Sequence, residues 1–322
     1  MGINKSFHQS VPLVTIGITC FNAEESIERA IHSAIDQDWP NLEIIVIDDY
    51  STDKCPTIIH LLAKNNSNIK FYRNDSNLGC AAARNKIIEL ANGEFISFFD
   101  DDDVSAANRV SLQVSSILEF EKVNPDAFSA CYASGLRIYP NGYRPPFQAV
   151  GSQDKVPTGH IMSDCLLFNK RDEGVFYGNG TPTCSLTIRK STLLNAGQFD
   201  VSLKRQEDVD LAIRLGFQGC AFIGVPEQVI EQYVSIGSDK SALTEFESGQ
   251  AILDKYKDYL LSQNQYYYMK LWSLMRYHHF SGRRSKAVLV LLKLMVRYPV
   301  RALKHFSKSA YARFLHELKM KA

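Results

Sequence analysis

Short apolar runs alternate with helix-like segments through the first hundred residues, and this alternation limits the possible folds more than any other feature of the chain. The apolar runs lie at 13–19, 43–48, 69–72 and 94–99. The helix-like segments lie between them at 24–36, 53–64 and 80–91. Strand followed by helix, repeated, is typical of a parallel sheet with crossover helices. The sequence therefore predicts an α/β fold with a mainly parallel sheet flanked by helices.

Polar side chains follow three of these strands. In an open parallel sheet, ligands bind beyond the carboxyl ends of the strands, so residues at these positions are candidates for a binding site. The candidates are Thr19, Cys20, Phe21 and Asn22 after the first strand, Asp48 to Thr52 after the second, and Asp100 to Asp103 after the fourth. We expect the three strand ends to converge on one acidic crevice.

Four consecutive aspartates, Asp100 to Asp103, follow the apolar strand F-I-S-F-F. Like charges this close require a cation, and carboxylate oxygens suit Mg²⁺ or Mn²⁺, which usually also bind phosphate oxygens of a substrate. If the segment is extended, Asp100 and Asp102 share one face and Asp101 and Asp103 the other. At most two of the four are then expected to bind the metal.

A second carboxylate site is predicted in the helix R-Q-E-D-V-D-L-A-I-R-L. Helical spacing puts Asp208 on the same face as Leu211, Ala212 and Leu215, so its side chain is expected to point inward. Asp210 has a partner at i+4 in Arg214, and Glu207 favours the helix N-terminus. Asp208 has no such local partner, which makes it the candidate general base, with Glu207 beside it as the second candidate catalytic carboxylate.

Two further residues have candidate roles in binding a nucleotide. Asp49 follows the apolar run I-I-V-I, where its carboxylate could accept the imide N–H of a base such as uracil. Arg84, in the helix after a glycine turn, could contact a phosphate or pair with the aspartates. Ser51 and Asp53 are interpreted as turn and N-cap residues.

Five motifs in order resemble the family 2 glycosyltransferases of bacterial polysaccharide synthesis. They are V-T-I-G-I-T-C-F-N, E-I-I-V-I-D-D-Y-S-T-D, N-L-G-C-A-A-A-R-N, G-E-F-I-S-F-F-D-D-D-D and G-Q-F-D-V-S-L-K-R-Q-E-D-V-D-L-A-I-R-L, and they span roughly residues 11 to 235. The resemblance implies a GT-A fold, a nucleotide-diphosphate-sugar donor with UDP as the carrier, a divalent metal and inversion at the anomeric carbon.

The resemblance also implies roles for individual residues. Asp49 corresponds to the carboxylate that recognises the base, Asp100 or Asp101 to the ribose contact, Asp102 to the metal ligand and Asp208 to the general base. Two departures stand out: Asp101 fills a position that is usually small, and E-Q-Y-V-S-I-G-S-D-K-S lacks the histidine that many members have there. The register of the ribose and metal contacts and the third metal ligand are therefore left open.

Pattern changes along the chain predict two regions. Residues 140–182, rich in Gly, Pro and aromatic residues, are expected to be irregular loops over the site. The sheet pattern fades after about 235, and helical spacing dominates from about 241. We therefore expect a nucleotide-sugar-binding and catalytic domain at 1–240 and a helical, basic C-terminal region at 241–322.

Charge is distributed unevenly between these regions. Residues 283–322 contain eleven Lys or Arg and one acid, which leaves a net charge of −9 on residues 1–282. In the tail, Lys293, Arg297, Arg301, Lys304 and Lys308 recur at helical spacing, with Leu303, Phe306, Ala310 and Phe314 on an apolar side and Pro299 separating two helices. Such a tail fits adsorption to an anionic membrane surface, or packing on the body of the protein; no nucleic-acid motif accompanies it.

The seven cysteines are odd in number and scattered, without metal-ligand spacing, and no apolar run is long enough to span a bilayer. The sequence therefore predicts a cytoplasmic enzyme, peripheral on the inner face of the cytoplasmic membrane. The expected reaction is transfer of a sugar to a hydroxyl of a glycan or a lipid-diphosphate-linked sugar in O-antigen or capsule synthesis. The alternatives are a non-catalytic nucleotide-sugar-binding module and a nucleotidyltransferase, although the glycine-rich basic loop typical of the latter is missing from T-C-F-N-A-E-E-S.

Overall fold

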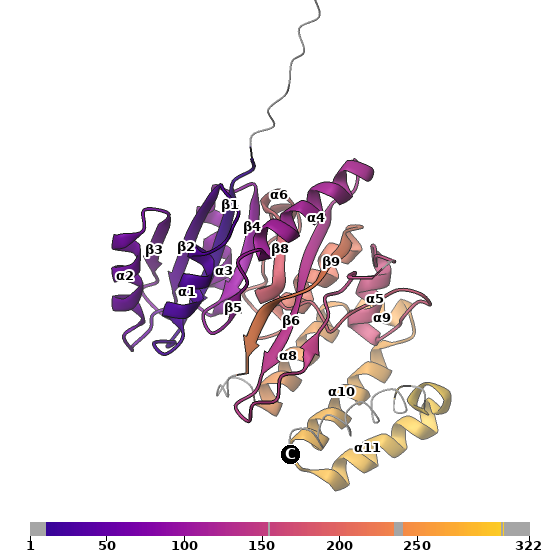
Figure 1. The fold of residues 1–322 in the computed structure, drawn as a ribbon. Coiled ribbons are helices and arrows are strands. Elements are labelled where there is room, and N and C mark those ends of the chain that lie inside the picture. Colours follow the sequence, from indigo (N-terminus) through magenta and orange to yellow (C-terminus); the bar gives the residue numbers. More distant parts are fainter. Residues whose placement is uncertain (1–10, 154, 235–240, 304, 306–322) are drawn as a thin grey trace, which may run out of the picture.

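The computed structural model describes residues 11–153, 155–234, 241–303 and 305 and contains one nine-stranded mixed sheet (Figure 1). Its main path runs β3-β2-β1-β4-β8-β6-β9-β5, and β7 pairs with β6. The strands are β1 Val14–Cys20, β2 Leu42–Asp48, β3 Ile69–Arg73, β4 Phe95–Asp100, β5 Val104–Ser105, β6 Ser129–Ile138, β7 Pro146–Phe147, β8 Leu186–Arg189 and β9 Ala221–Tyr233.

The first four long strands form the parallel half of the sheet, as the alternating pattern predicts. β1 pairs in parallel with β2 and β4, and β2 pairs in parallel with β3. β8 is antiparallel to both of its neighbours, whereas β6 and β9 are parallel to each other. The predicted mainly parallel sheet is confirmed, with β8 as an antiparallel strand in its middle.

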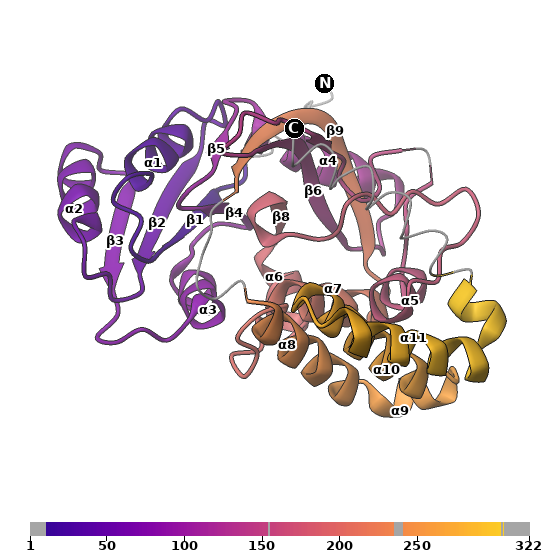
Figure 2. The ribbon, with the colours of Figure 1, turned by 90° about the horizontal axis from the view of Figure 1, so that it is seen from below.

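Helices cover both faces of the sheet and enclose two apolar cores (Figure 2). One face is covered by α1 Ile27–Ile35, α2 Cys55–Asn65 and α4 Arg109–Val123. The other is covered by α3 Cys80–Leu90, α5 His160–Phe168, α6 Lys190–Asn195 and α7 Glu207–Phe217. The three helices expected in the first hundred residues are thus confirmed.

Strand side chains alternate between these two cores, which explains why the strands are apolar on both faces. In β4, Ile96 and Phe98 lie in the core beneath α3, and Phe95 and Phe99 lie in the core beneath α1 and α4. At Gly17 in β1 an added Cβ would lie 2.4 Å from Cγ2 of Ile87, so a glycine is needed for α3 to pack this closely on the sheet.

The expectation of purely irregular loops at 140–182 is wrong in part. The segment contains β7 and the nine-residue helix α5, whose Met162 and Leu167 are buried. Gly159 and Asn169 flank the helix with φ values of 65° and 56°, so the glycine that suggested a loop is the residue at which the helix begins. The short helix η1 Thr183–Ser185 follows this segment.

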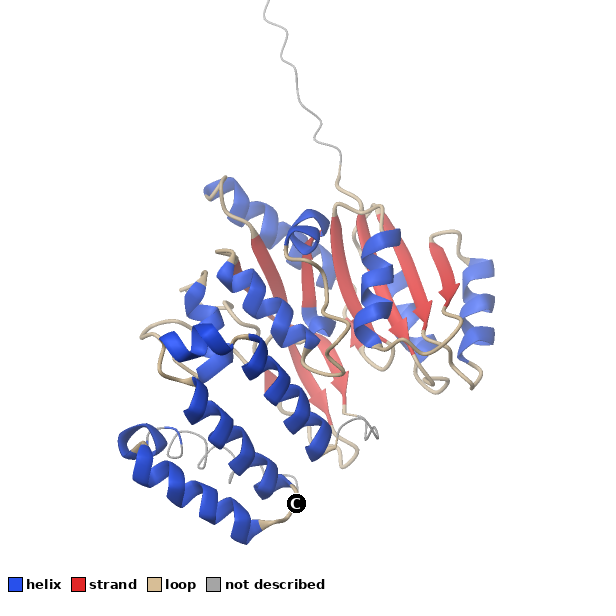
Figure 3. Ribbon diagram, turned by 180° about the vertical axis from the view of Figure 1, so that it is seen from behind, coloured by secondary structure: helices blue, strands red, loops and turns tan. Residues whose placement is uncertain are grey.

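The described part of the C-terminal region is helical and lies beside α5 and α7 (Figure 2 and Figure 3). Its helices include α8 Ala242–Lys255, α9 Lys257–Ser262, α10 Tyr266–Phe280 and α11 Arg284–Arg297. Fully buried Asp210 in α7 binds this region, since it accepts a hydrogen bond from the Tyr256 hydroxyl at 2.8 Å and lies 2.7 Å from Nζ of Lys255. Its expected pair with Arg214 is also present, at 2.8 Å.

The basic tail begins with α11, which packs on α10 through Val290 and Leu294. The helix ends at Arg297 and helical residues resume at 299, so the predicted break at Pro299 is confirmed. Lys304, Phe306, Lys308, Ala310 and Phe314 lie outside the described residues. In the part of the chain that is described, no helix is both long and apolar enough to cross a membrane.

Candidate active site

The ends of β1, β2 and β4 meet at one edge of the sheet, as predicted. Thr19 pairs with Asp100 and Cys20 with Asp48 in the strand register. Just beyond the strands, the backbone N–H of Phe21 donates to Oδ2 of Asp101 at 3.0 Å. Residues from the ends of β1, β2 and β4 therefore lie together at this edge, and the crevice itself stays a prediction.

The turn after β1 is held to the turn after β2. Asn22 has a positive φ of 50°, a backbone conformation that asparagine tolerates better than most residues, and its Oδ1 accepts a hydrogen bond from the N–H of Thr52 at 2.8 Å. Phe21 is exposed and is free to contact a ligand. Thr19 approaches Cys80 at the start of α3, with Oγ1 3.8 Å from Sγ.

Asp49 is buried and faces the turn between β3 and α3. Its Oδ1 accepts hydrogen bonds from Asn74 Nδ2 at 2.8 Å and from the Leu78 N–H at 2.9 Å, and its Oδ2 accepts one from the Gly79 N–H at 2.7 Å. The carboxylate therefore stabilises this turn. Its assignment to base recognition stays a prediction.

Arg84 joins the two groups of acids. This buried side chain donates from Nη1 to Oε1 of Glu207 at 2.5 Å, and its Nη2 lies 3.5 Å from Oδ1 of Asp100. The interpretation that Arg84 pairs with the aspartates is thus confirmed for Asp100. The pair also fixes the start of α7 against the end of β4.

Asp208 follows Glu207 and is half-buried. Burial, together with the charge of Glu207, raises the pKa of Asp208 to about 6. Its Oδ1 accepts a hydrogen bond from the Val209 N–H at 2.8 Å. Leu211, Ala212 and Leu215 are buried on the same helix, so the predicted inward-facing side of α7 is present.

The four aspartates differ in their surroundings because the chain turns at Asp101 and Asp102. Asp101 and Asp102 are half-buried, and Asp103 is buried. Burial, with the charges of neighbouring aspartates, raises the pKa of Asp101 to about 7 and that of Asp103 to about 8. Arg29 donates to the backbone carbonyl of Asp102 at 2.8 Å.

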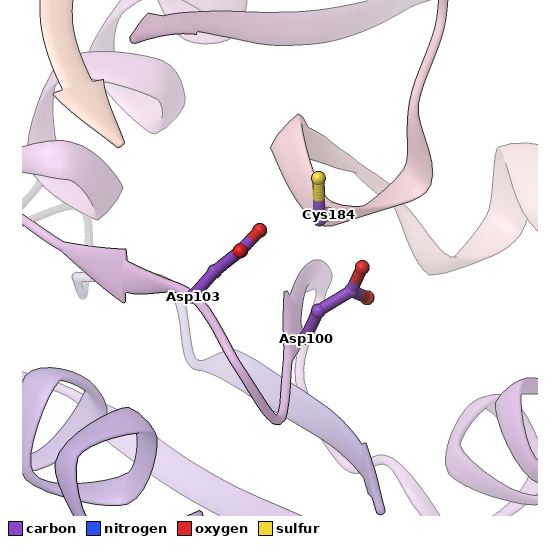
Figure 4. A group of neighbouring side chains, drawn as sticks. All are labelled: Asp100, Asp103 and Cys184. Carbon is purple, nitrogen blue, oxygen red and sulfur yellow. The ribbon is translucent and has the colours of Figure 1, made fainter. Parts of the chain in front are cut away.

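This turn overturns the expected division into two faces, which assumed an extended segment. The structure brings Asp100 close to Asp103 instead (Figure 4). One carboxylate oxygen from each lies, with Sγ of Cys184, in a group whose ligand atoms are all within 4.8 Å of one another. Asp102 lies outside this group, and its assignment as the metal ligand stays a prediction.

The donor set fits a divalent cation. Oδ2 of Asp103 is buried and has no stronger donor than the Cys184 thiol among the described residues, a costly state that a bound cation would relieve. Cys184 was not predicted as part of this group, because a single cysteine 81 positions after Asp103 has no metal-ligand spacing.

Comparison with known proteins identifies the family. The model of "Glycosyl transferase family 2" matches residues 15–174. A Campylobacter jejuni GalNAc(5)-diNAcBac-PP-undecaprenol beta-1,3-glucosyltransferase is 36% identical over 217 residues, which cover 62% of this chain and 68% of the relative. The chain belongs to glycosyl transferase family 2. Three other curated bacterial relatives align over shorter segments, and this chain spans 42% to 44% of their length.

Solved structures of low sequence identity share the fold of this family 2 glycosyltransferase. S. aureus TarS 1-349 in complex with UDP-GlcNAc matches with a TM-score of 0.60 at 18% identity, covering 90% of this chain and 78% of that one. A Pyrobaculum calidifontis mannosyltransferase in complex with GDP-Man and Mn²⁺ matches with a TM-score of 0.54 at 15% identity, covering 95% and 81%. The expected GT-A fold with a helical C-terminal region is confirmed.

Proposed function

We propose that this protein is an inverting glycosyltransferase of bacterial cell-surface polysaccharide synthesis. It would move a sugar from a UDP-sugar to a hydroxyl of a glycan or of a lipid-diphosphate-linked sugar. The observation that carries the proposal is the link made by Arg84, which fixes Glu207, and so the adjoining Asp208, against Asp100 at the end of β4. Arg84 therefore links the helix that carries the candidate base to the strand end that carries the candidate cation site.

The names of similar proteins support this choice of substrates. The C. jejuni relative is named as acting on an undecaprenol-diphosphate-linked glycan, and the TarS structure contains UDP-GlcNAc. An Escherichia coli relative, 38% identical over 107 residues, is named as a UDP-Glc-dependent glucosyltransferase with a diphosphoundecaprenol acceptor. These three names favour a UDP-sugar donor and a lipid-diphosphate acceptor.

In the proposed reaction, Asp208 accepts the proton of the acceptor hydroxyl as its oxygen attacks the anomeric carbon of the donor. Attack from the side opposite the nucleotide inverts that carbon. Asp49 binds the base, Asp100 or Asp101 the ribose, and Thr19, Phe21 and Asn22 line the donor side of the crevice. Glu207 holds Arg84, which supports the position of Asp208.

A divalent cation, Mn²⁺ or Mg²⁺, would stabilise the negative charge that develops on the departing diphosphate. Asp102 is the ligand that the family resemblance implies. The acidic turn supports the presence of a cation, because four consecutive carboxylates lie together, and among the described residues the buried Oδ2 of Asp103 has no stronger donor than the Cys184 thiol. The Mn²⁺ in the P. calidifontis structure agrees with this choice.

We further propose that residues 241–322 form a unit that brings the catalytic domain, 1–240, to the inner face of the cytoplasmic membrane. The support is the outer side of α11, which exposes large apolar side chains instead of covering them. These are Val288, Leu289, Leu292, Met295 and Val296, and beyond the helix Val300 and Leu303. Exposed Arg284, Lys286, Lys293 and Arg297 accompany them, the combination that binds anionic lipid surfaces.

The experiment is a panel of UDP- and GDP-sugars incubated with the protein and Mn²⁺ or Mg²⁺, with release of nucleoside diphosphate as the readout. Release from one donor that EDTA abolishes is expected. Metal-dependent nucleotide binding without release, even with a polyprenyl-diphosphate-linked sugar as acceptor, would favour the non-catalytic binding module. Formation of a nucleotide-sugar from a sugar phosphate and UTP would instead identify a nucleotidyltransferase.

A further inference from the structure

A cysteine lies among the acidic side chains of the crevice. Cys184, in η1, is only 2% exposed, and its Sγ belongs to the group with Asp100 and Asp103 whose ligand atoms lie within 4.8 Å of one another (Figure 4). The Nε2 of Gln232 donates to this sulfur at 3.3 Å. The sulfur is the acceptor in this bond, so the thiol proton is not used in it. That proton, or a metal ion that replaces it, points to other neighbours of the sulfur.

Asp103 provides an independent sign of a missing ligand. The residue is 6% exposed, and its Oδ1 accepts a hydrogen bond from the Tyr233 N–H at 3.0 Å. Its Oδ2 is buried, and the Cys184 thiol, a weak donor, is the group among the described residues that approaches it as a hydrogen-bond partner. Buried carboxylate oxygens usually have stronger partners than a thiol, and a bound cation is one of the few species that would satisfy this one.

Nearby arginines leave room for this cation. Arg84 approaches Asp100 but makes its short bond, 2.5 Å, to Glu207. Arg109, buried beneath the site, donates to Gln113, Ser105 and the carbonyl of Phe98, all of which are neutral. Among the hydrogen bonds between described residues, none runs from Arg84 or Arg109 to Asp103.

We infer that Cys184, as a thiolate, binds the divalent cation of this enzyme together with Asp100 and Asp103. The inference rests on the metal dependence in the proposed function. It assigns Asp100 to the metal, which leaves Asp101 as the ribose contact, and it replaces Asp102 as the protein ligand by Asp100, Asp103 and Cys184. On binding, the metal ion displaces the thiol proton to solvent. Two carboxylates and one thiolate favour Mn²⁺, Co²⁺ or Zn²⁺ over Mg²⁺, because sulfur is a softer ligand than oxygen.

The test is a titration of the EDTA-treated full-length protein with Co²⁺, followed by absorption spectroscopy. A thiolate ligand gives a sulfur-to-cobalt charge-transfer band, so the wild type is expected to show it. Cys184→Ser should bind Co²⁺ without that band, and Asp103→Asn should bind it at least about 10-fold more weakly. Cys165→Ser is the matched control, since this half-buried cysteine lies in α5 and outside the metal group.

Calorimetric titrations with Mn²⁺ and Mg²⁺ provide the second readout. Cys184→Ser should lower the ratio of Mn²⁺ affinity to Mg²⁺ affinity by about 10-fold, because a hydroxyl replaces the sulfur. Cys184→Ala carries the same expectation if the serine variant does not fold. Co²⁺ binding by the wild type without a charge-transfer band would overturn the role of Cys184 and leave the proposed function intact. No binding of any of the three ions, with or without UDP, would overturn both.

Discussion

Arg84 and Glu207, separated by 123 positions in the sequence, form a hydrogen bond of 2.5 Å between Nη1 and Oε1. The bond joins α3 to the first residue of α7, and Asp208 is the next residue along that helix. Both partners are largely buried, so solvent screens the interaction weakly. The position of the candidate base therefore depends on a side chain that follows the β3–α3 turn.

Arg84→Gln is expected to destabilise the protein by about 3 kcal/mol, because removing one partner of a buried ion pair leaves Glu207 and Asp100 without their cation. Urea unfolding measures the change. Lys86→Gln in the same helix is the control, since its pair with Glu89 is exposed and contributes less than about 1 kcal/mol. Equal, small effects of the two substitutions would show that the buried pair is not important for stability.

Asp49→Asn is expected to weaken both the β3–α3 turn and binding of a uridine donor. The carboxylate accepts three N–H donors, and an amide replaces one of its oxygens by a further donor, at a cost of about 1–3 kcal/mol. Thermal unfolding and calorimetric binding of UDP measure the two effects. Asp75→Asn, an exposed residue of the same turn, should change neither; an unchanged UDP affinity in Asp49→Asn would contradict the assignment of Asp49 to the base.

The alternation of apolar runs with helix-like segments was sufficient to predict the parallel half of the sheet and the polar residues at its strand ends. Both features depend on local patterns in the sequence. For Arg84 the sequence left open a phosphate contact or a pair with the aspartates, and the structure has the second of these, to Asp100. Its bond to Glu207 was not predictable, since it joins segments 123 positions apart. The turn at Asp101 and Asp102 also escaped prediction, because four identical residues give no signal of where the chain bends. Helix α5 was not predicted, because the Gly and Pro residues around it indicated a loop. Cys184 was not predicted as a site residue, because a single cysteine has no spacing pattern.

The activity should rise with pH on the acidic side of its profile, with a midpoint near pH 6. Only the carboxylate form of Asp208 accepts a proton, and burial raises the pKa of this group to about 6, so the active form accumulates as the pH increases through that value. The dependence of kcat/KM on pH between 4.5 and 8 measures it. A profile that stays flat down to pH 4.5 would contradict the assignment of a raised pKa to the base.

The raised pKa of Asp208 also makes a prediction about stability. A carboxyl whose folded pKa exceeds its unfolded value stabilises the fold most below pH 4, and this contribution is lost as the pH rises through about 6. Asp208→Asn does not ionise, so its Tm relative to the wild type should be higher at pH 8 than at pH 4.5. Calorimetry at the two pH values tests this; a difference of the opposite sign would contradict the burial of an ionised Asp208.

The double substitution Leu289→Glu and Val296→Glu is expected to reduce binding to anionic vesicles by at least about 10-fold, because it removes two apolar side chains from the outer side of α11 and adds negative charge. Co-sedimentation with phosphatidylglycerol vesicles measures the loss. Val123→Glu is the control, since Val123 is 78% exposed but lies at the end of α4. Wild-type protein that does not sediment with these vesicles would contradict membrane attachment through α11.

The central claim is that Asp208 performs the proton transfer in a metal-dependent sugar transfer. The most direct measurement compares nucleoside diphosphate release by the wild type and by Asp208→Asn, with the donor that the panel identifies and with donor affinity measured in parallel. We predict that release is abolished in the variant while the donor affinity stays within about 3-fold of wild type. Release at a substantial fraction of the wild-type rate would contradict the assignment of Asp208 as the base.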